Sequence, residues 1–154
     1  MKIYLAGPLF TTAEREFNAR LAGLLRRAQH EVWLPQEHEG RQLSAAQLFA
    51  LDVAGIDGAD VVVANMDGPD PDSGTCWECG YAYGKKPIVL FRTDFRVGED
   101  PEKAPYNLML TESATCHLRL PFADAAAVAE ALLRALAALP RLSGHVQKRN
   151  ADVG

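Results

Sequence analysis

The sequence lacks the features that mark nucleic-acid, membrane and secreted proteins. Its 154 residues hold 16 Lys and Arg against 20 Asp and Glu, so there is no basic excess to attract a phosphate backbone. No apolar run reaches the ~18 residues of a membrane span. Gly7-Pro8 ends the first apolar run too early for a signal peptide. These absences predict a small soluble cytoplasmic protein with neither a nucleic-acid polymer nor a membrane as its partner.

Cysteine is also scarce. The three cysteines are Cys76, Cys79 and Cys116, and an odd number argues against a disulfide framework. The first two have CxxC spacing, but they stand in mid-chain rather than after a first strand, which disfavours a redox role. A zinc site would also need Cys116 and His117, whose side chains on a strand point to opposite faces. We interpret all three as reduced thiols.

Glycine-rich phosphate loops are absent as well. Gly7 is the only early glycine near a predicted strand, and it belongs to neither a GxGxxG nor a Walker pattern. Dinucleotide and ATP binding are therefore not expected. The sequence signals no metal and no organic cofactor.

What the sequence does contain is a regular alternation of short apolar runs with helical periodicity. Strands are expected at 3–6, 31–34, 60–64, 87–91 and 115–120, and helices at 12–29, 44–58, 75–84 and 123–139. This pattern predicts an α/β fold, a Rossmann-like (flavodoxin-like) three-layer sandwich. Its five-stranded, mainly parallel sheet should have the order 2-1-3-4-5. One domain is expected over 1–140, followed by a polar tail at 141–154.

The predicted topology locates a binding site. In such sheets ligands bind beyond the carboxyl ends of the strands, between the first and third strands. The loop after the third strand carries Asp67, Asp70 and Asp72 and leads to Glu78. We expect Glu78 in the first turn of the next helix, where the helix dipole would keep it ionised. Asp67 and Asp70 are interpreted as turn residues, whereas Asp72 suits a cap or a functional acid equally well.

Four segments of the sequence occur together in a recognisable order. They are Ile3-Tyr4-Leu5-Ala6-Gly7-Pro8-Leu9-Phe10, Asp52-Val53-Ala54-Gly55-Ile56 with the strand after it, the stretch Asp72-Ser73-Gly74-Thr75-Cys76-Trp77-Glu78-Cys79-Gly80-Tyr81-Ala82, and Asn107-Leu108-Met109. Each is weak alone. In this order and spacing, over roughly residues 2–120, they resemble the nucleoside 2-deoxyribosyltransferases.

The resemblance implies catalytic roles for four residues. Glu78 matches the nucleophile that attacks the anomeric carbon, and Tyr4 matches the hydroxyl that holds its carboxylate. Asp72 matches an acid that contacts the deoxyribose and assists proton handling. Asp52 matches the acid that faces the base and protonates it as it leaves.

The resemblance also implies substrate-binding residues. Asn107 would come from a neighbouring subunit to the 5′-hydroxyl end, and Met109 would pack against the nucleophile. An apolar wall for the base would be formed by Leu9 and Phe10, beside Gly7. Gln36 and Glu37 lie in the loop that often recognises the base, at a register the sequence does not fix.

The function implied is transfer of 2-deoxyribose between nucleobases in nucleoside salvage. The mechanism implied is a retaining double displacement through a covalent glycosyl-Glu78 intermediate. The second base attacks from the side that the first base left, so the configuration of the sugar is retained. The partners implied are deoxynucleosides, free nucleobases and further copies of the chain, as a dimer or hexamer. Pro8 and Leu9 differ from the glycine and tryptophan of some well-known members, which leaves the base preference open.

Two alternatives remain. A 2-deoxynucleoside 5′-monophosphate N-glycosidase shares the Tyr/Asp/Glu set, but it needs a Ser-rich, Arg-bearing phosphate loop. The loop here is Gly-Pro-Leu-Phe-Thr-Thr, and Asn107 suits an uncharged 5′-hydroxyl. The other alternative is a nucleotide-sensing domain without turnover, which would not need a poised nucleophile.

Overall fold

The computed structural model describes residues 1–38, 42–96 and 106–139. In this part of the chain five strands form one sheet of order β2-β1-β3-β4-β5, and every neighbouring pair is parallel. The predicted fold class and strand order are therefore confirmed. The elements are β1 (Lys2–Ala6), α1 (Thr12–Arg27), β2 (Glu31–Trp33), the 3₁₀ turn η1 (Pro35–Glu37), α2 (Ala45–Gly58), β3 (Val61–Asn65), α3 (Ser73–Ala82), β4 (Ile88–Arg92), α4 (Leu108–Ser113), β5 (Cys116–Arg119) and α5 (Ala125–Ala138).

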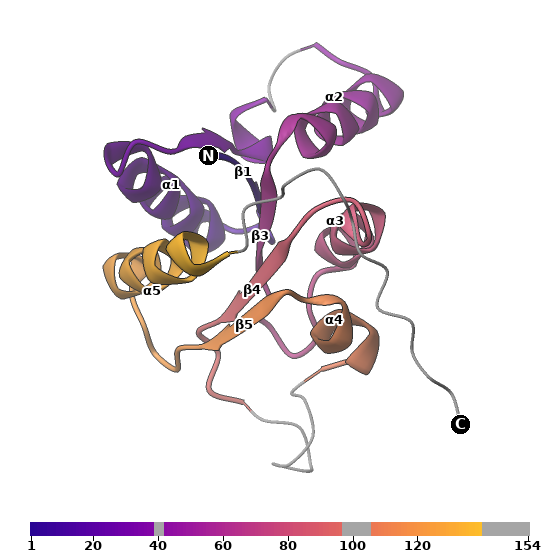
Figure 1. Cartoon of the computed structure of the whole chain (residues 1–154). Coiled ribbons are helices and arrows are strands. Elements are labelled where there is room, and N and C mark those ends of the chain that lie inside the picture. The colour runs from indigo at the N-terminus through magenta and orange to yellow at the C-terminus, as the bar shows by residue number, and fades with distance from the viewer. Residues whose placement is uncertain (39–41, 97–105, 140–154) are drawn as a thin grey trace, which may run out of the picture.

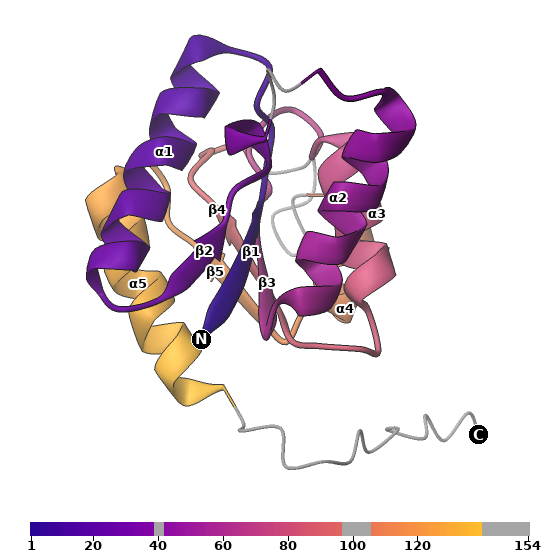
Figure 2. The same cartoon turned by 90° about the horizontal axis from the view of Figure 1, so that it is seen from above.

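Helices cover both faces of the sheet. Helices α1 and α5 lie on one face and α2, α3 and α4 on the other, as Figures 1 and 2 show from two directions. Side chains alternate along β1, so Ile3 and Leu5 join the core under α1 and α5, whereas Tyr4 and Ala6 join the core under α2 and α3. This alternation places the Tyr4 side chain on the face of the sheet where α3 carries Glu78.

Side-chain caps fix where the helices begin. Thr11 and Glu14 form a capping box at the start of α1, and Ser44 caps α2. Helix α3 begins at Ser73, two residues earlier than predicted, because the Asp72 carboxylate accepts a hydrogen bond from the Thr75 backbone N–H at 2.8 Å. Glu78 consequently lies in the second turn of α3, and its predicted place in the first turn is wrong.

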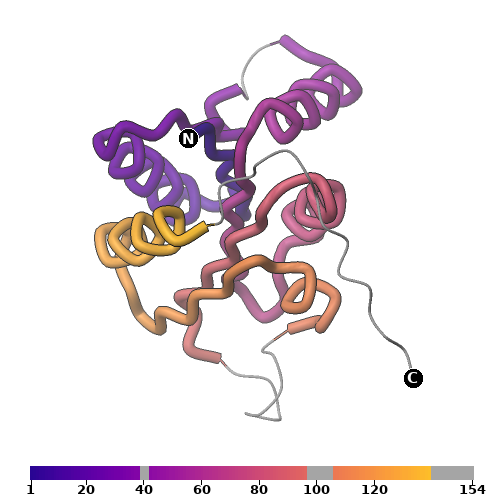
Figure 3. The backbone as a smooth tube through the Cα atoms, in the orientation of Figure 1, coloured from indigo at the N-terminus to yellow at the C-terminus, as the bar shows by residue number. Residues whose placement is uncertain are grey.

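The short helix α4 is absent from the sequence prediction. Its N-cap is Asn107, whose side-chain oxygen accepts a hydrogen bond from the Met109 backbone N–H at 2.9 Å. Six residues are too few to show a helical period. Figure 3 traces α4 beside α3, against which it packs.

Two further expectations concern the chain as a whole. No helix in the described ranges is long and apolar enough to span a membrane. The polar tail expected at 141–154 lies outside the described residues, as do positions 39–41 of the expected base-recognition loop.

Candidate active site

The centre of the candidate site is a hydrogen bond between β1 and α3. The Tyr4 hydroxyl donates to Oε1 of Glu78 at 2.5 Å. Tyr4 is fully buried, and this burial, followed by the nearby Glu78 charge, raises the pKa of its hydroxyl far above the ordinary value. Tyr4 therefore stays protonated, and it fixes one oxygen of Glu78 by a strong, charge-assisted bond.

Burial decides the protonation of Glu78. It raises the pKa of the carboxyl to about 7, while the Tyr4 hydrogen bond acts in the opposite direction. The negative charges of Asp52 and Asp72 raise this pKa further. The expectation that a helix dipole keeps Glu78 ionised is therefore wrong, because the residue lies a turn too far along α3 and too deep. A carboxyl group with this pKa exchanges its proton near neutral pH.

Asp52 and Glu78 share one pocket. It has a volume of about 300 Å³ and lies between α2 and α3. Helix α2 contributes Phe49, Asp52, Val53 and Ile56, and α3 contributes Gly74, Trp77 and Glu78. This volume is at the small end of ligand pockets. Two acids that the sequence separates by 26 positions thus face the same space.

Asp72 combines two tasks. Its carboxylate caps α3 through Thr75, accepting from the backbone N–H and from the hydroxyl at 3.1 Å. Its charge also raises the pKa of Glu78. Both the structural and the functional interpretation of Asp72 are therefore compatible with its place at the start of α3.

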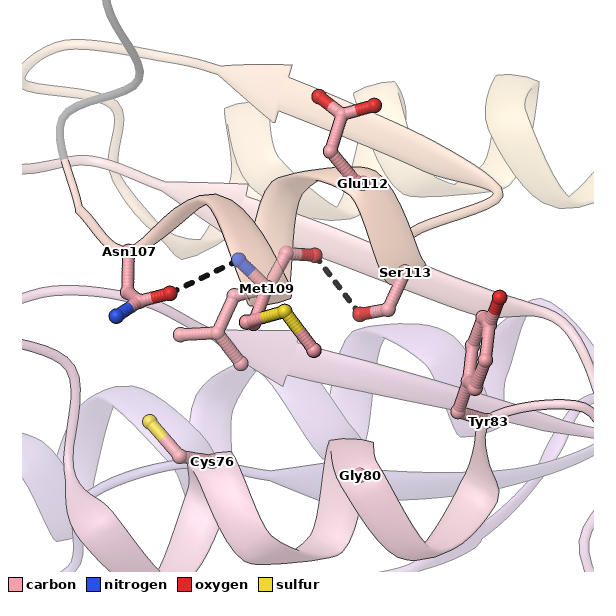
Figure 4. A pocket seen from close by; sticks show the side chains of 8 residues that line it. Cys76, Gly80, Tyr83, Asn107, Met109, Glu112 and Ser113 are labelled. Carbon is pink, nitrogen blue, oxygen red and sulfur yellow. Dashed lines mark hydrogen bonds between the residues drawn. The ribbon is translucent and has the colours of Figure 1, made fainter. Parts of the chain in front are cut away.

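Asn107 and Met109 line a different cavity. This cavity, of about 700 Å³, lies between α3 and α4 and includes Cys76, Gly80 and Tyr83 (Figure 4). The Met109 side chain is 72% exposed. Within one chain, neither Asn107 nor Met109 lines the pocket of Glu78.

The remaining predicted binding residues surround the end of β1 and the η1 turn. Phe10 is exposed, Leu9 is half-buried, and neither lines the pocket of Glu78. Gly7 allows a close approach of two loops, because a Cβ there would lie 3.1 Å from Cβ of Asn65.

The side chains of Gln36 and Glu37 in η1 have partners within the chain. The Gln36 side-chain nitrogen donates to the Arg15 carbonyl at 2.9 Å, and the Gln36 side-chain oxygen accepts from the Asn18 side-chain amide at 3.3 Å. Glu37 pairs with Arg26 at 2.7 Å. In a single chain, both side chains therefore connect η1 to α1.

Sequence reasoning missed two aromatic residues in the pocket. Phe49 of α2 has no role in the sequence prediction, and Trp77 is named only within the segment that begins at Asp72. They are 56% and 47% exposed, and they line the pocket with Asp52 and Glu78. The available signal was spacing, since residues 49, 52 and 53 share one face of a helix.

A second missed feature is the support of the β3–α3 loop. Buried Arg92 donates to the carbonyl of Gly68 at 2.9 Å and also to that of Met66. Asp67 accepts from the Thr93 backbone at 2.6 Å, from the Thr93 hydroxyl at 2.7 Å and from the Asp94 backbone at 2.8 Å. The turn role predicted for Asp67 is thus present, and the loop leading to Asp72 is bonded to the end of β4.

The cysteines are free thiols. Burial raises the pKa of Cys76, and it raises that of Cys79 to about 12, so both thiols stay protonated. In the described part of the chain, no group of three or more His, Cys, Asp and Glu is placed to hold a metal ion.

Comparison with solved structures finds known proteins with this fold. The fold matches a conserved protein from Enterococcus faecalis V583 at 26% identity and a TM-score of 0.69, over 88% of this chain and 98% of that one. It matches a 2-deoxyribosyltransferase from Bacillus psychrosaccharolyticus at 29% identity and a TM-score of 0.66, over 84% and 90%. The CMP N-glycosidase BcmB of Clostridium botulinum shares the fold at 20% identity and a TM-score of 0.62, over 88% and 99%.

Two sequence comparisons complete the picture. The search of curated proteins finds no match to the chain, whereas a family model agrees with the fold comparison. The sequence model described as nucleoside 2-deoxyribosyltransferase matches residues 3–109, which include Tyr4, Asp52, Asp72, Glu78 and Asn107. The chain therefore belongs to the nucleoside 2-deoxyribosyltransferase family, a class of enzymes that act on N-glycosidic bonds.

Proposed function

We propose that this protein transfers 2-deoxyribose between nucleobases, with Glu78 as the nucleophile and Asp52 as the acid–base group. The observation that carries the proposal is the pairing of Glu78 with buried Tyr4 at 2.5 Å, at the edge of a pocket that Asp52 also lines. Such a pairing holds one carboxylate oxygen in a fixed orientation beside the pocket, as a nucleophile needs.

In the first step, an oxygen of ionised Glu78 attacks C1′ of the deoxynucleoside. The C1′–N bond breaks and its electron pair stays on the base nitrogen, and Asp52, which must be protonated in the substrate complex, gives that nitrogen its proton. An ester joins C1′ to Glu78. A 2-deoxy sugar assists this step, because no electron-withdrawing 2-hydroxyl opposes the positive charge that develops at C1′.

In the second step, another base attacks C1′ from the side that the first one left. The ester bond to Glu78 breaks, and the incoming nitrogen gives its proton to Asp52. Two inversions restore the original configuration, as in retaining glycosidases. If water attacks instead, free deoxyribose is released, so the exclusion of water separates a transferase from a hydrolase.

The charges of the site favour a nucleoside over a nucleoside monophosphate. Among the described residues, none that lines the pocket of Glu78 or the cavity beside Asn107 is a Lys, Arg or His. A 5′-phosphate would add negative charge beside Asp52, Asp72 and Glu78 without a cation to balance it. The 5′-monophosphate N-glycosidase therefore remains the second candidate.

The proposal includes a homo-oligomer that acts in cytoplasmic nucleoside salvage. Met109 and Tyr83 are exposed large side chains that line the cavity between α3 and α4 (Figure 4), and Leu108 of α4 is exposed as well. Exposed apolar surface of this kind is typical of an interface. A second copy on this surface would bring its Asn107 to the 5′-hydroxyl end of the neighbouring site.

Product analysis tests the proposal. Purified protein is incubated with a 2-deoxynucleoside and a different free base, and in parallel with the corresponding 5′-monophosphate. We expect the exchanged nucleoside, lost in Glu78→Ala and kept in the control Glu16→Ala, which changes an exposed acid on α1. Release of deoxyribose 5-phosphate from the monophosphate alone would establish the hydrolase instead. Normal exchange in Glu78→Ala would refute the proposed nucleophile.

A further inference from the structure

An aromatic ladder runs along the outside of α3 and ends at the pocket. The Trp77 ring stacks on Tyr81, with centroids 5.3 Å apart and planes 11° apart. The Phe49 ring of α2 meets Trp77 at 5.3 Å and 58°. At the other end, the Lys85 ammonium lies 3.2 Å from the centre of the Tyr81 ring. The ladder thus connects the two helices that form the pocket.

The ladder holds Trp77 in one orientation although much of the ring is exposed. The Tyr81 hydroxyl donates to Asp57 at 3.2 Å, which anchors the ring on which Trp77 stacks. Phe49 and Trp77 keep about half of their surface in water and belong to neither buried core. Large aromatic side chains ordered in this way supply rigid contact area for a planar ligand.

We propose that Phe49 and Trp77 form an aromatic lip that packs a nucleobase over the glycosyl-Glu78 ester and keeps water from it, so that this pair sets the ratio of transfer to hydrolysis. The proposal rests on the proposed function, since it needs the Glu78 ester. Both residues line the same pocket as Asp52 and Glu78. A planar base packed against this pair would present its ring nitrogen to Asp52.

The chemistry of the two outcomes differs only in which molecule occupies the lip. In either case a nucleophile forms a bond to C1′, the C1′–O bond to Glu78 breaks, and the nucleophile gives a proton to Asp52. A nucleobase gains contact with aromatic side chains, whereas water gains none. Truncation of the lip should therefore weaken capture by a base and leave capture by water unhindered.

The main experiment measures the partition of the intermediate. Phe49→Ala, Trp77→Ala and Trp77→Phe are compared at one fixed concentration of acceptor base, by the ratio of exchanged nucleoside to free deoxyribose. We expect both alanine variants to lower this ratio about tenfold, in line with base–aromatic stacking elsewhere, and Trp77→Phe to restore most of it. The matched control is Phe95→Ala, which removes an exposed aromatic side chain stacked on Phe122.

A second readout does not depend on turnover. The chain has two tryptophans, so Trp33→Phe leaves Trp77 as the only one. Free nucleobase should then quench the fluorescence of Trp77 saturably, and Phe49→Ala should weaken that binding. An unchanged partition ratio together with absent quenching would overturn the lip while leaving the transferase intact.

The oligomeric state supplies the remaining control. If the alanine variants dissociate the protein in light scattering and lose transfer and hydrolysis equally, the aromatic pair is a subunit contact and the proposal is wrong. If the unaltered protein exchanges no base at all, the proposed function fails. The quenching titration then still decides whether a base binds at Trp77.

Discussion

Tyr4 and Glu78 lie 74 positions apart, and their side chains meet at 2.5 Å. The meeting depends on two periodicities. Tyr4 points out of the sheet toward α3 because side chains alternate along β1, and Glu78 points inward because α3 begins at the Asp72 cap. The result is a carboxyl group with a raised pKa and a fixed orientation, which becomes the ionised form that a nucleophile requires as the pH rises through about 7.

Tyr4→Phe should shift the pH profile of exchange. The hydrogen bond from Tyr4 lowers the pKa of Glu78, so its removal raises that pKa. Because only the ionised carboxylate attacks, kcat/KM rises with pH through about 7 in the unaltered protein. In Tyr4→Phe this rise should move to alkaline pH by about one pH unit. A profile that stays in place while the rate falls would assign Tyr4 a packing role only.

Glu78→Gln should stabilise the fold at alkaline pH. The pKa of Glu78 is about 7 in the folded protein, above its ordinary value of 4.5. The stability that the protonated carboxyl contributes below pH 4.5 is therefore lost as the pH rises through about 7. Glutamine carries no charge and avoids this loss. Urea denaturation should show a gain of about 1–3 kcal/mol near pH 8 that shrinks toward about pH 5. An equal effect at both pH values would contradict the raised pKa.

The sheet and most of the helices could be predicted because apolar periodicity is a local property of the chain. The apolar run before Asn65 is buried along its whole length, and the Thr11 and Ser44 caps are local motifs. Helix α4 and the pKa of Glu78 could not be predicted in this way. The first is too short to have a period, and the second depends on burial beneath residues distant in sequence.

The candidate site was predicted unevenly for the same reason. Tyr4, Asp52, Asp72 and Glu78 lie on three elements that topology brings together. Phe49 has helical spacing with the core residue Ile56, so spacing alone does not separate Phe49 from the core. Only the packing of α2 against α3 shows that Phe49 lines the pocket with an exposed ring, whereas Ile56 lines it from the buried core.

Asp67→Asn should loosen the loop that presents Asp72. The carboxylate of Asp67 accepts three hydrogen bonds through its two oxygens, and an amide offers only one oxygen acceptor. We expect a loss of about 1–3 kcal/mol in the free energy of unfolding. The control is Asp70→Asn in the same exposed loop, which should change stability by less than about 0.5 kcal/mol. Thermal denaturation of both variants measures these losses of stability. Equal losses in the two variants would show that the hydrogen bonds of Asp67 do not stabilise the loop.

Mixing two inactive variants should restore activity if sites are shared between subunits. Glu78→Ala removes the nucleophile, and Asn107→Ala removes the residue proposed to reach a neighbour's 5′-hydroxyl. In a mixed oligomer, one site combines an intact Glu78 from one subunit with an intact Asn107 from the other. Exchange should therefore reappear after the two proteins are dissociated and reassembled together, and it should stay absent when each is treated alone. If the mixture remains inactive although light scattering shows mixed oligomers, Asn107 serves only its own chain, where its observed role is to cap α4.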